Sequence, residues 1–161
     1  RAATPRWPVD DPAIVEAVRN ATAGAASPRE LVLALLVLLD TRVEAERPPP
    51  SSREPRAERA LPPEVLARGS GSALERADLL VTLCRAAGLG AHLVAGWRPD
   101  VRSPHVWVRV RLGGAGWIPV DPAALWLGTS TRYVPLMAST DGRLPLLHLA
   151  RPRVRRVPTG G

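Results

Sequence analysis

Several residue types are absent or nearly absent from this chain. Its 161 residues include no Lys, Gln or Phe, one Asn and one Cys. Because Cys84 stands alone, no disulfide can form within the chain and no cysteine-based zinc site can be assembled. All 22 basic residues are Arg, a bias that fits a GC-rich bacterial genome and leaves the compartment of the protein undetermined.

Long apolar runs are also missing. The longest, residues 31–39, is too short to span a bilayer, and no basic and apolar secretion signal opens the chain. We therefore expect no membrane span in this chain. Since the chain begins with Arg1 and not with Met, we expect it to be an excised or processed piece of a longer protein.

The formal net charge of +7 does not identify a partner. Arginines are spread along the sequence except for a cluster within residues 151–161, which we interpret as a solvated basic tail. Nucleic-acid binding through this tail ranks last among the functions considered, because no known nucleic-acid module is visible. It would require binding that weakens steeply with salt.

The length allows one domain with a single core, so residues 1–161 are predicted to form one domain. Apolar periodicity, capping residues and turn residues predict helices near 12–23, 31–43, 61–69 and 72–88, and strands near 91–97, 105–112, 117–121, 132–137 and 144–150. The Pro- and Ser-rich stretch 47–60 is predicted to be a surface loop. Helices followed by an antiparallel sheet define an α+β fold.

Two helices allow more specific expectations. The helix over 31–43 is apolar on nearly all sides, which predicts that it lies deep in the core. In the helix over 72–88, a stripe of Ala73, Ala77, Leu80, Val81 and Cys84 is expected to face the core.

The stretch 71–121 combines a Gly-x-x turn into a helix with a histidine that opens one strand and an aspartate that closes the next. It resembles the core of the transglutaminase-like superfamily, and the part of this chain that carries the resemblance lies within residues 61–122. That family pattern has Gly-x-Cys before a helix, an Ala four residues after the Cys, Leu-Arg-x-x-Gly-Ile-Pro-Ala-Arg, a strand ending in Gly-aromatic, His-x-Trp-Val and Trp-x-x-Val-Asp. The matching residues are Gly71, Ala77, Arg85, Gly88, Ala91, Gly96, Trp97, His105, Trp107, Val108, Trp117, Val120 and Asp121.

The resemblance implies a papain-like fold, with the nucleophile helix packed on the sheet, and Cys-His-Asp acyl transfer or hydrolysis on peptide or protein amides. In that chemistry His105 would be the base and Asp121 would orient it. Ser72, Trp97 and Trp107 would line the substrate cleft. No cofactor or metal site is expected.

The nucleophile position, however, holds Ala73. Cys84 lies eleven residues further along the same helix, roughly 16 Å away at 1.5 Å per residue, so it is expected to be a buried structural cysteine. The hydroxyl of Ser72 points about 100° away from position 73 and lacks an aligned base. As written, the sequence predicts a protein that cannot form a thioester.

Two explanations of Ala73 stay open. One is an engineered Cys→Ala replacement that leaves His105 and Asp121 in place. The other is natural loss, which the mild departures at Gly90 (usually Pro) and His92 (usually Arg) favour, whereas retention of both His and Asp favours recent or engineered loss. An alternative function is a non-catalytic scaffold module that binds a peptide or protein in the same cleft.

Overall fold

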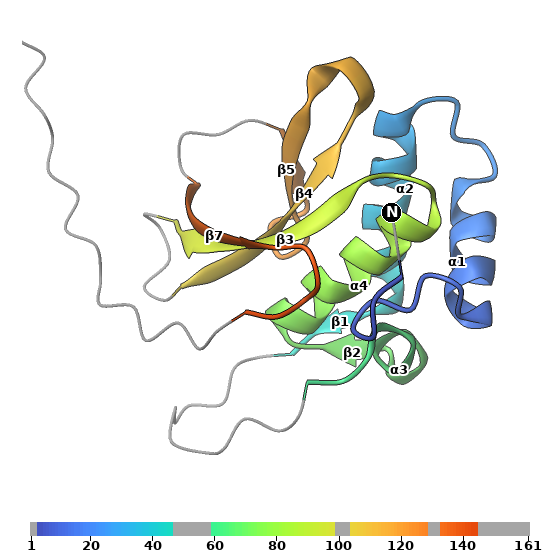
Figure 1. Ribbon diagram of the computed structural model, residues 1–161. Coiled ribbons are helices and arrows are strands. Elements are labelled where there is room, and N and C mark those ends of the chain that lie inside the picture. Colours follow the sequence, from blue (N-terminus) through green and yellow to red (C-terminus); the bar gives the residue numbers. More distant parts are fainter. Residues whose placement is uncertain (1–2, 47–58, 99–103, 129–132, 145–161) are drawn as a thin grey trace, which may run out of the picture.

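The chain folds into a layer of helices packed against one face of an antiparallel sheet, as Figure 1 shows for this computed structural model. The structure describes residues 3–46, 59–98, 104–128 and 133–144. The predicted α+β class is confirmed. Among the described residues, no helix has the length and apolarity needed to cross a bilayer.

Four helices are α1 (Pro12–Thr22), α2 (Pro28–Arg42), α3 (Pro62–Arg68) and α4 (Ala73–Ala86). The first three begin with Pro, whose fixed φ suits the first helical position. Asp11, Ser27 and Ser72 cap α1, α2 and α4 with side-chain oxygens that accept backbone N–H groups. The predicted helices are therefore present, with boundaries shifted by a few residues.

Helix α4 is the centre of the domain, because it contacts the other three helices as well as strands β3 and β4. All residues from Glu75 to Arg85 are buried. The predicted apolar stripe is therefore too narrow a description of α4, which is enclosed on every side after its first turn. Ala73, a member of the predicted stripe, is exposed.

The expectation that the second helix lies deep in the core is wrong in part. Val32, Leu35 and Leu39 of α2 are buried, but Leu33 is 42% exposed and Val37 is 62% exposed. The reason is that α2 packs on α1 and α4 with one side only, so its second apolar side faces outward.

The main sheet has the strand order β6-β5-β4-β3-β7, and every neighbouring pair in it is antiparallel. Its strands are β3 (Ala91–Trp97), β4 (His105–Arg111), β5 (Trp117–Asp121), β6 (Trp126–Leu127) and β7 (Val134–Ser139). A second, parallel pair joins β1 (Glu44–Ala45) to β2 (Ser70–Gly71). A short 3₁₀ turn, η1 (Gly113–Ala115), connects β4 to β5.

The sheet follows the sequence expectations closely up to Asp121. The two-residue strands β1, β2 and β6 were not predicted, because so short a segment carries no periodicity. The predicted strand over 132–137 is present as β7. The strand over 144–150 and the basic tail over 151–161 lie outside the described residues almost entirely, as does most of the loop over 47–60.

Candidate functional site

Three reversals of the chain bring the start of α4, the start of β4 and the end of β5 to one end of the domain. A short turn leads from α4 into β3, which packs back along the helix, and β4 pairs antiparallel with β3. Strand β4 therefore runs in the direction of α4, and β5 returns beside it. The start of β4, which is His105, and the end of β5, which is Asp121, thus lie at the end of the sheet where α4 begins.

His105 and Asp121 are in direct contact. Nε2 of His105 lies 2.7 Å from Oδ2 of Asp121, and both residues are buried. The carboxylate fixes the ring orientation and stabilises the tautomer that carries its proton on Nε2. Nδ1, the other ring nitrogen, is then left as the atom that can accept a proton or a hydrogen bond.

Asp121 has further partners that the sequence did not predict. Arg98 Nη1 lies 2.8 Å from Oδ2, and the hydroxyl of Tyr133 donates to the same oxygen at 2.7 Å. The backbone N–H of Ala123 donates to Oδ1 at 2.9 Å. Burial raises the pKa of Asp121, but the hydrogen bond and charge of His105, with the donors Tyr133 and Ala123, outweigh it, so this pKa lies below its ordinary value.

An aromatic cluster surrounds this pair. Tyr133 stacks on Trp126 with ring centroids 5.2 Å apart and meets Trp107 edge-on at 5.1 Å. Trp107 in turn stacks 6.2 Å from the His105 ring. These contacts hold the Tyr133 hydroxyl toward Asp121 and restrict the orientation of His105.

The two predicted cleft tryptophans are mostly buried. Trp107 is 1% exposed and Trp97 is 8% exposed. Nε1 of Trp97 is buried and has no hydrogen-bond partner among the described residues. Their observed role is packing, and their contact with a substrate stays a prediction.

Ala73 is the first residue of α4 and is exposed. Arg76, one turn further along the helix, donates to the carbonyl of Pro122 at 3.2 Å and to that of Val43 at 2.6 Å. Residues three apart share a helix face, so the turn that carries Ala73 is tied to the residue that follows Asp121.

Ser72 has a structural role in the same turn. Its hydroxyl accepts the N–H of Glu75 and donates to the Glu75 carboxylate at 2.9 Å, which also accepts the Ser72 N–H. This reciprocal arrangement is a capping box. Burial raises the pKa of Glu75, but the donors Ser72 and Ala60 and the charge of Arg68 outweigh it and lower this pKa. The predicted contact of Ser72 with substrate stays a prediction.

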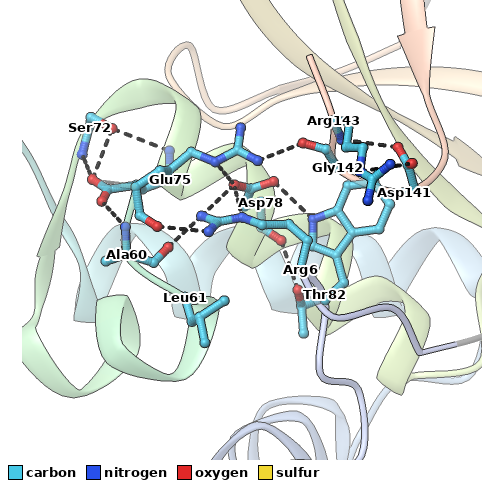
Figure 2. A network of polar contacts seen from close by, with 12 residues as sticks. Arg6, Ala60, Leu61, Ser72, Glu75, Asp78, Thr82, Asp141, Gly142 and Arg143 are labelled. Atoms are coloured by element: carbon cyan, nitrogen blue, oxygen red, sulfur yellow. Dashed lines mark hydrogen bonds and ion pairs between the residues drawn. The ribbon is translucent and has the colours of Figure 1, made fainter. Parts of the chain in front are cut away.

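A second carboxylate fixes α4 from the side, as Figure 2 shows. Asp78 is fully buried and accepts from Trp7 Nε1 at 2.9 Å and from Arg6 Nε at 3.0 Å. It also forms an ion pair with Arg59, whose Nε lies 2.9 Å from Oδ2. Arg6 also donates to the carbonyl of Ala60. The N-terminal segment and the start of the α3 region are thereby attached to the helix that carries position 73.

Cys84 is fully buried, and burial raises the pKa of its thiol to about 12. A protonated thiol without solvent access is neither a nucleophile nor a metal ligand. Within the described ranges, no group of three or more His, Cys, Asp or Glu side chains is placed to hold a metal ion.

Sequence reasoning missed Arg98, Tyr133 and Trp126. Tyr133 is the only tyrosine of the chain and lies in the strand predicted over 132–137, which is a weak signal for a buried hydroxyl with a partner. Nothing in the spacing of Arg98 and Tyr133 predicts that both reach Asp121, because they converge only through the antiparallel pairing of β3 with β7.

The four helices and the antiparallel sheet of the described residues define an α+β core. A family model described as the transglutaminase-like superfamily matches residues 15–122, about two thirds of the chain. The chain belongs to the transglutaminase-like superfamily, a family associated with cysteine protease and acyltransferase activity. A search of curated proteins finds no match.

Solved structures share the fold. A candidate cysteine protease from Cytophaga hutchinsonii aligns with a TM-score of 0.70 at 18% identity, over 86% of this chain and 45% of that one. The periplasmic domain of TgpA from Pseudomonas aeruginosa aligns with a TM-score of 0.55 at 24% identity, over 71% and 43%. A structure described as a TGase aligns with a TM-score of 0.55 at 18% identity, over 83% of this chain and 36% of that one. The chain spans less than half the length of each.

Proposed function

We propose that this chain is a transglutaminase-like domain whose site retains the base and its orienting carboxylate but performs no thiol acyl transfer as written. The observation that carries the proposal is the contact of 2.7 Å between His105 and Asp121 at the end of the sheet where α4 starts with Ala73. A methyl group there cannot attack an amide carbonyl, so no thioester forms.

The rest of the site favours a loss confined to the thiol. The Ser72–Glu75 capping box and the bond from Arg76 to Pro122 hold the first turn of α4 in place. Arg98 and Tyr133 hold Asp121. In a helix start of this kind, a cysteine thiolate is stabilised by the helix dipole and the free N–H groups of the first turn.

A second candidate function is binding of a peptide or protein segment in the same cleft without cleavage. Its supporting observation is that Ala73 is exposed, which leaves the start of α4 open to a peptide backbone. Calorimetry that measures the affinity of a peptide for the protein and for His105→Ala separates the two functions. An affinity unchanged in His105→Ala would support the non-catalytic scaffold and contradict a retained catalytic arrangement.

The test of the main proposal is Ala73→Cys, incubated with a peptide that carries a thiol-reactive amide mimic and analysed by peptide mass spectrometry. We expect covalent labelling at position 73, because the rest of the site is in place. The unsubstituted protein should stay unlabelled, since Cys84 is buried.

Two controls make the result specific. Ala67→Cys places a thiol at an exposed position of α3, away from the pair, and should react slowly. Ala73→Cys combined with His105→Ala should lose most of the labelling. A correctly folded Ala73→Cys protein that reacts no faster than Ala67→Cys would contradict the proposal and indicate a site that has diverged beyond its thiol.

A further inference from the structure

Trp117 has an unusual environment for a large aromatic residue in a strand. Its side chain is 45% exposed, and its ring meets the ring of His92 edge-on at 4.5 Å. The ring also lies over Gly90, where a Cβ atom would sit 3.5 Å from it. Besides Ala73, the chain departs from the family pattern at Gly90 and His92, and both of these residues lie against Trp117.

Open cavities lie on either side of Pro28, between the start of α2 and the β4–β5 connection. The one beside Trp117 has a volume of about 550 Å³ and is also lined by Gly90 and Arg111. The other has a volume of about 420 Å³ and is lined by Arg29 and Ile118. We call the two together the hairpin groove.

The hairpin groove is lined by two arginines, Arg29 and Arg111. Arg29 and Arg111 are exposed, and neither has an ion-pair partner in the part of the chain that the structure describes. Glu30, the acidic residue next to Arg29, accepts a hydrogen bond from the backbone N–H of Ala26. Burial, with the charges of Arg109 and Arg85, holds the pKa of His92 below its ordinary value, so at neutral pH His92 adds no charge.

The groove is separate from the His105–Asp121 pair. His105 opens β4 and Arg111 closes it, seven residues in all, so at about 3.3 Å per residue the two ends lie roughly 20 Å apart. A ligand held by Trp117 and Arg111 can therefore be recognised independently of the pair.

We propose that the hairpin groove binds an acidic peptide segment of a partner protein. An apolar or aromatic side chain of the segment packs on the exposed face of Trp117, and its carboxylates pair with Arg111 and Arg29. Trp and Arg are the residue types that contribute most to protein interfaces, and a guanidinium pairs with a carboxylate through two parallel hydrogen bonds. The unpaired arginines favour an acidic partner over a neutral one.

The test is selection of binders from a random dodecapeptide library on the immobilised protein. We expect the selected peptides to be enriched in Asp and Glu. By calorimetry, a selected peptide should bind at least ten-fold more weakly to Trp117→Ala and to Arg111→Ala. Since Trp117 and Arg111 are exposed, both variants should keep their circular dichroism spectra.

Matched controls are Arg143→Ala, which removes an arginine whose side chain is 92% exposed elsewhere, and His105→Ala. Both should leave the affinity unchanged, and binding should weaken as salt is raised. Selected peptides without acidic enrichment, failure to select any peptide, or an affinity that depends on His105 but not on Trp117 would each overturn the proposal.

Discussion

At the scale of single residues, Asp121 has more partners than a simple orienting carboxylate needs. Its Oδ2 is shared by His105, Arg98 and Tyr133. Because Arg98 compensates the buried charge permanently, the carboxylate is stabilised whether or not His105 carries a proton. The ionised form of Asp121 is therefore a structural element of the fold as well as part of the site.

Asp121→Asn should lower the free energy of unfolding by about 3 kcal/mol at pH 7, because it leaves the Arg98 charge without its buried partner. The pKa of Asp121 is lowered in the folded state. Its contribution is therefore fully present above the unfolded pKa of about 3.9. The stability that ionised Asp121 contributes is lost as the pH falls through the lowered pKa of Asp121 in the folded protein.

Urea denaturation of the protein and of Asp121→Asn at pH 7 and at pH 3 measures this contribution. The difference in free energy of unfolding between the protein and Asp121→Asn should be smaller at pH 3 than at pH 7. The exposed residue Asp141 supplies a matched control, since Asp141→Asn should change little at pH 7. A difference for Asp121→Asn that is the same at both pH values would show that its charge is not the stabilising feature.

At the scale of the elements, Gly96 allows β7 to approach β3 beside the site. A Cβ atom on Gly96 would lie 2.1 Å from the carbonyl oxygen of Val134 and 2.7 Å from the ring of Trp107. Both distances are far below van der Waals contact, and the oxygen belongs to the backbone. The register of the two strands also shifts at this point.

Gly96→Ala should therefore destabilise the protein by roughly 3 kcal/mol, at the upper end of the cost of inserting one extra carbon into a packed site. Gly114→Ala is the matched control, because a Cβ atom there meets nothing within 4 Å. Thermal unfolding of both variants checks the prediction. Equal thermal unfolding midpoints for Gly96→Ala and Gly114→Ala would contradict the close approach of β7 to β3.

The elements also show how far the sequence determines the fold. Capping by Asp11, Ser27 and Ser72, and the strict alternation in β4, are local signals, so the helices and central strands could be predicted. Pairing of β3 with β7 is not local, and through it Arg98 and Tyr133 reach Asp121. His105 and Asp121 could be predicted as a pair only because the family resemblance supplies the topology.

At the scale of the whole molecule, Asp78 links segments that are far apart in the sequence. It binds Arg6 and Trp7 from the N-terminal segment and Arg59 from the residues before α3. Arg59 also donates to the carbonyl of Gly142 at 2.6 Å. The helix that carries the nucleophile position is therefore held by both ends of the described chain.

Asp78→Ala should lower the free energy of unfolding by about 3 to 5 kcal/mol, because two guanidinium groups lose a buried partner. It should also expose the N-terminal segment to limited proteolysis near Trp7. Asp141→Ala, which removes a surface partner of Arg143, should change neither. Unaltered urea midpoints in Asp78→Ala would show that the segments are held by apolar packing alone.

The central claim is that the site lacks only its thiol, and the most direct measurement is the pH dependence of iodoacetamide alkylation of Ala73→Cys. If α4 and His105 still favour a thiolate, the alkylation rate should reach half its maximum well below the ordinary thiol pKa of about 8.5. In Ala67→Cys the half-maximum should lie near that ordinary value. The same half-maximum in both variants would contradict the claim.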